Sequence, residues 1–235
     1  NAKFADAYVR ENMIYILPAT YPAIVKLDCE NNMLEYIVEN IPTCDYLFRP
    51  GTAQMGNKLF VPNTKDNLVL EFDMETDEIQ IHHIGKNNHG SWSIVKDDNL
   101  LWLIPKVHGA VVKWDYLSGE IQEYEQYPEG YRESNFGFTK GYKRGDYIYV
   151  LPVQSNVFLR IDSVGGMERS EFLPLASEEV VTYMPLLGEY EYFFIENREN
   201  TEGSRTFYRL NRSDNMVETW AFSFKQGRDD YARDY

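Results

Sequence analysis

The 235-residue chain is 43% hydrophobic and 15% aromatic, and its formal net charge is -14 at pH 7. An acidic chain without runs of Lys or Arg lacks the basic stripe that a nucleic-acid partner requires, and the same charge disfavours an anionic membrane surface. No window approaches the roughly 18 consecutive apolar residues of a membrane-spanning helix, so neither nucleic-acid binding nor membrane insertion is expected.

The chain opens with "NAKFADAYV" and has no initial Met. Asn1 and Ala2 match the end of the Ser-Asn-Ala remnant that tag cleavage leaves, so residues 1–3 are expected to be a tag remnant and lead-in. Polypeptide upstream is then expected to be missing, and the sequence leaves the cellular compartment open.

Five related segments follow one another along the chain. In chain order they are "IYILPATYPAIVKLD", "LFVPNTKDNLVLEFD", "LWLIPKVHGAVVKWD", "IYVLPVQSNVFLRID" and the degenerate "YFFIENRENTEGSRTFYRLN". The proline positions in the first four are Pro18, Pro62, Pro105 and Pro152, spaced 44, 43 and 47 residues apart. Self-similarity at this period indicates a stacked or radial repeat.

Each repeat is expected to form four short strands. In the third copy these are 91–96, 99–105, 110–115 and 120–125, separated by turn-forming residues. The second strand is apolar on both faces, as a strand buried between neighbouring sheets should be. The fourth alternates apolar and polar residues, which is typical of an outer strand with one wet face.

Four-stranded units of about 45 residues predict an all-β fold, a β-propeller of four-stranded antiparallel blades. The expected blades are about 4–40, 50–84, 91–126, 136–173 and 180–221, within one domain at 4–221 that is followed by a tail at 222–235. Five blades are the first interpretation, and part of a six- or seven-bladed ring is the alternative. Lys113-Trp114-Asp115 and "DYLSGEI" resemble the repeats of kelch-like, PQQ-like and tryptophan-aspartate propellers. That resemblance implies the architecture and carries over no catalytic residue.

Most of the repeated residues are expected to be structural. The prolines end second strands, where they remove a ladder donor. The aspartates that close each segment, such as Asp115, are expected to accept backbone N–H groups in the turn to the fourth strand. Cys29 and Cys44 lie in loop classes that open on opposite faces, which predicts two free thiols. His82 and His83 are adjacent on a strand and point to opposite faces, so no metal site and no cofactor are predicted.

The candidate site lies where two sets of loops gather on one face. The connections between blades enter the next inner strand at Gly51, Gly90 and Gly137, where glycine would permit close backbone approach. The residues expected around the central opening are Arg49, Asn88, His89, Trp92, Arg132 and Asn135. The loops between second and third strands are expected to add Tyr21, Asn63, Lys65, Lys106, His108 and Gln154.

This set of cations, amides and aromatic rings suits a glycan or another small polar ligand, because flat rings stack on sugars while amides and guanidinium groups bond hydroxyls. The first hypothesis is therefore a non-enzymatic binding propeller. A protein-interaction platform is the alternative, which predicts an exposed apolar patch. A glycan hydrolase or lyase is the third hypothesis, and it requires paired carboxylates about 5 to 10 Å apart, whereas Glu133 is the obvious acidic residue in these loops.

Overall fold

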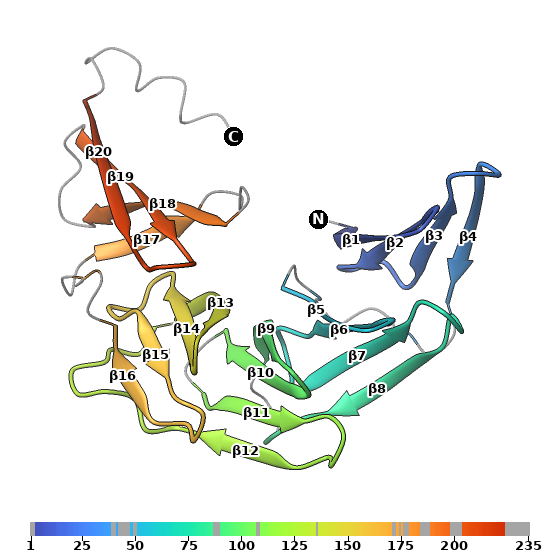
Figure 1. Cartoon of the computed structure of the whole chain (residues 1–235), viewed down its shortest axis with the longest axis horizontal. Coiled ribbons are helices and arrows are strands. Elements are labelled where there is room, and N and C mark those ends of the chain that lie inside the picture. Colours follow the sequence, from blue (N-terminus) through green and yellow to red (C-terminus); the bar gives the residue numbers. More distant parts are fainter. Residues whose placement is uncertain are drawn as a thin grey trace.

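The computed structural model consists of strands joined by turns and loops (Figure 1). It describes residues 3–38, 41, 48, 51–86, 90–106, 109–134, 136–170, 173, 175, 179–183, 189–197 and 204–223. Within these ranges there is no helix, and hence no helical segment long and apolar enough to cross a membrane. The strands form five antiparallel sheets, and each sheet contains four strands in chain order.

Each sheet is called a blade and is numbered in chain order. Blade 1 contains β1 (Phe4–Arg10), β2 (Met13–Pro18), β3 (Ile24–Asp28) and β4 (Met33–Ile37). Blade 2 contains β5 (Ala53–Met55), β6 (Lys58–Pro62), β7 (Leu68–Asp73) and β8 (Ile79–His83). Blade 3 contains β9 (Ser91–Asp97), β10 (Leu100–Pro105), β11 (Val111–Asp115) and β12 (Ile121–Tyr124). Blade 4 contains β13 (Phe138–Arg144), β14 (Tyr147–Pro152), β15 (Leu159–Ile161) and β16 (Met167–Arg169). Blade 5 contains β17 (Glu179–Tyr183), β18 (Tyr190–Asn197), β19 (Ser204–Asn211) and β20 (Val217–Ser223).

The protein is thus an all-β propeller with five four-stranded blades, as the repeat predicts. The strands of blade 3 differ from their predicted bounds by only one residue at any end. In the first four blades the second strand ends at the repeated proline, and its interior residues are mostly buried. The apolar runs therefore form the middle of each blade, where both faces of the sheet are covered.

The repeated aspartates close the turns between third and fourth strands. One carboxylate oxygen of Asp115 accepts the backbone N–H groups of Leu117 and Ser118 at 2.9 and 3.1 Å. The bonds from Ser118 lower the pKa of Asp115. Equivalent bonds form at Asp28, Asp73 and Asp162, and at Asn211 in the degenerate fifth copy. The structural role predicted for these residues is confirmed.

Apolar faces hold successive blades together. Tyr15 and Leu17 of blade 1 pack with Leu59 and Leu70 of blade 2, and similar clusters join blades 2 and 3, blades 3 and 4, and blades 4 and 5. The first strands are innermost, because β9 contacts both β5 and β13. The blades follow an arc, and blades 1 and 5 lie on either side of an opening in it (Figure 1).

Candidate functional site

Backbone hydrogen bonds bring the two predicted sets of loops together on one face. The residue after each second-strand proline accepts an N–H from the start of the next blade: Asn63 from Ser91 at 2.8 Å, and Lys106 from Gly137 at 2.9 Å. The same bond joins Ala19 to Phe48 at 3.1 Å and Val153 to Val181 at 2.8 Å. The connections between blades and the loops between second and third strands therefore share a rim, which is called the axial mouth below.

Two of the three predicted glycines hold neighbouring backbones in close contact at this rim. A Cβ atom on Gly90 would lie 2.0 Å from the carbonyl carbon of Thr64, and one on Gly51 would lie 2.6 Å from Cβ of Ser93. The packing role predicted for Gly51 and Gly90 is confirmed. For Gly137 it is wrong, because the nearest atom to a Cβ there is the Tyr131 hydroxyl at 3.5 Å, an ordinary van der Waals distance.

Trp92 and Lys106 meet at the axial mouth together with Phe136, a residue that sequence reasoning missed. The rings of Trp92 and Phe136 are 6.2 Å apart and nearly perpendicular. The Lys106 ammonium lies 5.9 Å from the Trp92 centroid and 5.2 Å from the Phe136 centroid. Phe136 is 40% exposed and Trp92 is half-buried. The cluster combines an apolar platform with a cation at its edge, a pairing favoured by the negative ring faces.

Asn63 lies at the same rim and is fully buried. Its side-chain oxygen accepts the backbone N–H of Lys65 at 2.8 Å. Its amide nitrogen, Nδ2, has no hydrogen-bond partner among the residues that the structure describes. A buried amide donor costs free energy when it is left unpaired, so this nitrogen is a candidate contact for a polar guest or an ordered water.

The other predicted residues are placed differently. Tyr21 packs in blade 1 against Phe4, at 5.3 Å between ring centroids, and 6.2 Å from Tyr36. Arg132 is exposed and its backbone N–H bonds Asn156, while the N–H of Gln154 bonds the Phe136 carbonyl at 2.9 Å. The side chain of Lys65 is exposed. Five predicted residues lie outside the described ranges: Arg49, Asn88, His89, His108 and Asn135.

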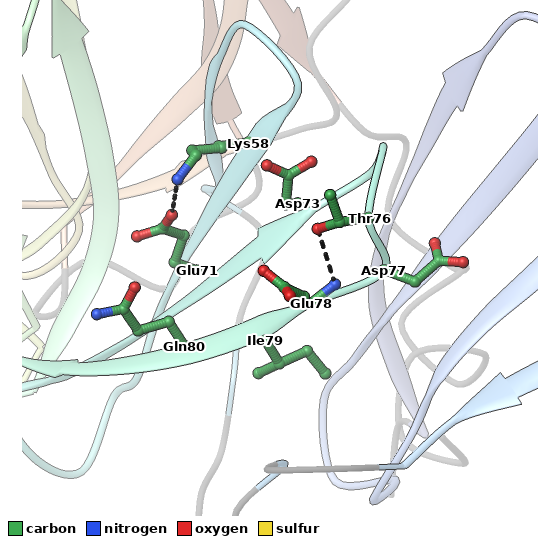
Figure 2. A pocket seen from close by; sticks show the side chains of 8 residues that line it. All are labelled: Lys58, Glu71, Asp73, Thr76, Asp77, Glu78, Ile79 and Gln80. Atoms are coloured by element: carbon green, nitrogen blue, oxygen red, sulfur yellow. Dashed lines mark hydrogen bonds and ion pairs between the residues drawn. The ribbon is translucent and has the colours of Figure 1, made fainter.

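A second candidate region is a hollow of about 540 Å³ in blade 2 (Figure 2). It is lined by Lys58, Glu71, Asp73, Thr76, Asp77, Glu78, Ile79 and Gln80. Lys58 and Glu71 lie together on one side of the hollow, and Asp77 bonds Lys26 of blade 1 through a short ion pair. Four carboxylates and one ammonium thus border a space large enough for a small molecule.

Glu71 is the most constrained of these carboxylates. One of its oxygens accepts Lys58 Nζ at 2.5 Å and the Tyr116 hydroxyl at 3.0 Å, and the other lies 2.6 Å from Nε2 of His82. Burial opposes ionisation, but the bonds from His82, Lys58 and Tyr116 outweigh it and hold the pKa of Glu71 at about 2. The carboxylate is therefore ionised at neutral pH and already bonded by both oxygens. It is suited to tying blade 2 to Tyr116 of blade 3, and it is unsuited to donating a proton.

Of the histidines and cysteines that the sequence singled out, the structure describes His82, His83 and Cys29. His82 and His83 are neighbours on β8; His82 bonds Glu71, and His83 is exposed. Cys29 is a free, exposed thiol as predicted, and Cys44 lies outside the described ranges. Within the described part of the chain, no three His, Cys, Asp or Glu side chains are grouped closely enough to hold a metal ion.

Comparison with solved structures places the arrangement of blades among known folds. A chain of the mitotic checkpoint complex matches with a TM-score of 0.53 and 9% identity, over 96% of this chain and 79% of that chain. The extracellular domain of BT4673 from B. thetaiotaomicron matches in two crystal structures with TM-scores of 0.61 and 0.58 and 13% identity. These two alignments cover 93% and 94% of this chain. The chain is a β-propeller repeat protein.

At identities of 9% and 13%, these likenesses concern the fold alone. The chain spans only 28% of the length of each BT4673 chain that it matches. No protein-family profile matches the sequence. No curated protein sequence matches it either.

Proposed function

We propose that the protein is a non-enzymatic binding propeller that recognises a glycan or another small polar ligand at the axial mouth. The observation that carries this proposal is the cluster of Trp92, Phe136 and Lys106. A sugar ring stacks on a flat indole through its C–H groups, while an ammonium binds its hydroxyl or carboxylate oxygens. The unpaired Nδ2 of the buried Asn63 adds a donor on the same rim.

The charge of the chain supports this reading of the cluster. The formal net charge is -14, yet the described side chains that sequence reasoning assigned to this face include Lys65, Lys106 and Arg132. Asp66 and Glu133 lie in the same loops, so the supporting observation is the Lys106 ammonium beside the two rings, a positive charge that attracts polar or anionic groups. The proposed ligand therefore carries hydroxyl groups, carboxylate groups or both.

A binding screen tests the proposal. The chain is titrated with mono- and oligosaccharides, uronic acids and divalent metal ions while its melting temperature and tryptophan fluorescence are followed. A ligand that binds only the folded state raises the melting temperature by mass action, and one that stacks on Trp92 also changes its emission. We expect a saturable response to one class of sugar or sugar acid.

Matched variants locate the site. Trp92→Ala and Lys106→Gln should each weaken binding by roughly tenfold or more, as the loss of a stacking or charged contact does. Trp220→Phe, at the far edge of blade 5, should leave it unchanged. Binding that survives Trp92→Ala would place the ligand elsewhere. No response to any member of the panel would reject the proposal and favour a platform for protein partners, which is the use that propeller blades support in general.

A further inference from the structure

The outer strand of blade 1, β4, carries a contiguous group of exposed apolar side chains. Met33 is 66% exposed, Leu34 is 52% exposed and Tyr36 is 53% exposed, and Val38, just after the strand, is 58% exposed. Leu34 and Tyr36 share one side of the strand because side chains alternate along it. Single apolar side chains are ordinary on a protein surface, but a contiguous group marks a surface that binds a partner.

The outer strands of blades 2 and 3 have more polar surroundings. β8 exposes Gln80 and His83. At β12, Glu123 and Glu125 form ion pairs with Lys86, which follows β8, at 3.1 and 3.2 Å. Polar and charged side chains at an outer strand discourage pairing with another chain. β4 presents apolar side chains in their place.

β4 also forms an edge of its sheet. The strand order in blade 1 is β1-β2-β3-β4, and among the described residues β4 pairs with β3 alone. Figure 1 shows β4 at the end of blade 1 that is farthest from β1. Along its other edge, alternate N–H and C=O groups have no strand partner in the described part of the chain. Such an edge can accept a further strand.

The surroundings of β4 are acidic. Between residues 27 and 48 the sequence has five acidic residues and no Lys, Arg or His: Asp28, Glu30, Glu35, Glu39 and Asp45. Glu30 and Glu35 are exposed. Lys26, which stands opposite Glu35 on β3, already pairs with Asp77 of blade 2. The edge therefore carries a negative charge that favours a cationic partner.

We infer that β4 is a docking edge for an extended, positively charged segment of a protein partner, which adds a fifth strand to blade 1. Backbone hydrogen bonds supply affinity in this mode, and alternate side chains of the guest supply specificity. The guest places apolar residues beside Leu34 and Tyr36, and cationic residues on the opposite side of the sheet, beside Glu35. A second copy of this chain fits less well, because it brings a net charge of -14 and the same acidic segment to the edge.

Designed peptides test the inference in the absence of any sugar. The parent probe is a fluorescently labelled eight-residue peptide in which Lys alternates with Val, and its binding is followed by fluorescence anisotropy. Two further peptides carry backbone N-methyl groups, one on every Val nitrogen and the other on every Lys nitrogen. Each modification removes the N–H donors from one edge of the guest strand and keeps its charge.

We expect saturable binding of the parent peptide. One methylated peptide should bind at least roughly tenfold more weakly than the other, because only one edge of the guest faces β4. Leu34→Ser and Glu35→Lys should each weaken binding of the parent peptide by roughly tenfold. Ile121→Ser, at an exposed apolar residue of β12, is the matched control and should leave binding unchanged. The melting temperature of each variant is compared with that of the native chain, so that lost binding is distinguished from lost folding.

Equal binding of the two methylated peptides would overturn the inference, because it would show attraction to an acidic surface without strand addition. Binding of the parent peptide that survives both Leu34→Ser and Glu35→Lys would also overturn it, as would the absence of saturable binding. Self-association of the native chain that Leu34→Ser abolishes, measured by sedimentation equilibrium, would instead assign the edge to a second copy.

Discussion

The two faces of blade 1 are built from the same kinds of residue and differ in how completely they are buried. Tyr15 and Leu17 face blade 2 and are buried, whereas Val9 and Tyr36 on the other face are largely exposed. The strand "MIYILP" supplies both sides in alternation. Both faces of the sheet are therefore apolar, and blade 2 buries one of them more completely than the other, on which Val25 is buried while Val9 and Tyr36 are exposed. The four predictions below test this contrast.

Leu17→Ala and Leu34→Ala remove the same atoms from the covered and the uncovered face. Leu17 is fully buried, so its truncation should lower the free energy of unfolding by about 3 kcal/mol through lost burial and a cavity. Leu34 is half-exposed, and its truncation should cost less than about 1 kcal/mol. Urea unfolding of the two variants measures both values. Equal losses would mean that the outer face of blade 1 is covered in solution.

Glu71→Gln should weaken the interface between blades 2 and 3 by about 2 kcal/mol at pH 7, because it breaks a buried charged network. The pKa of Glu71 is depressed to about 2 in the folded state from an ordinary value of 4.5. Its contribution is therefore fully present above pH 4.5 and is lost as the pH falls toward 2. Unfolding curves between pH 7 and pH 3 should show a smaller acid loss for the variant than for the native chain. Glu120→Gln, which removes an exposed carboxylate from the turn before β12, is the control and should change the free energy of unfolding at pH 7 by less than about 0.5 kcal/mol.

Gly90→Ala tests the close contact between blades 2 and 3 at the axial mouth. The new Cβ would lie 2.0 Å from the Thr64 backbone, so the backbone segments at Gly90 and Thr64 must move apart. This should lower the free energy of unfolding by about 1 to 2 kcal/mol. Gly137→Ala is the matched change with ordinary space around it, and it should have a smaller effect. Differential scanning calorimetry compares the two melting temperatures. A lower melting temperature for Gly137→Ala than for Gly90→Ala would contradict this account of the rim.

Val9→Lys should have the smallest effect on stability, within about 0.5 kcal/mol, because the side chain makes few contacts in residues 1–235. It places a charge beside Ile14 on the face of blade 1 that points away from blade 2, and it should reduce the binding of a hydrophobic dye such as ANS. Val164→Lys, in the exposed turn between β15 and β16 of blade 4, serves as the control and should leave dye binding unchanged. Undiminished dye binding by Val9→Lys would show that the exposed apolar surface lies elsewhere.

The fold could be predicted from sequence because its signals are local and repeated. Each proline and aspartate acts within a few residues, on the strand it ends or the turn it closes. Strands with two apolar faces and turns with Asp, Asn or Gly recur along the repeats. A strand or turn with a weak signal in one unit can therefore be assigned from the equivalent positions in the others. Positive φ angles at Asn32, Asp77, Gly119, Gly165 and Asn215 repeat this turn chemistry in the structure.

The candidate sites were harder to predict because they are made between units. Phe136 joins Trp92 across the boundary of blades 3 and 4, and no local pattern pairs these positions. Glu71 did carry a signal, since a carboxylate inside the apolar strand "LVLEFD" requires partners. One partner, Tyr116, is 45 residues away in the next blade, so identifying it required the packing angle between blades. The same angle determines whether the arc closes, and sequence periodicity does not report it.

Among the residues that the structure describes, the apolar clusters join each blade to its sequence neighbours, and this arrangement has a thermodynamic consequence. Its stability approximates a one-dimensional sum of blade terms and nearest-neighbour coupling terms. A terminal blade has one coupling term where a middle blade has two, so fraying starts at blades 1 and 5 and moves inward. Amide exchange should accordingly be slowest in blade 3 and faster toward either end. Joining the ends would add the missing coupling to both terminal blades at once and turn gradual fraying into a single cooperative transition.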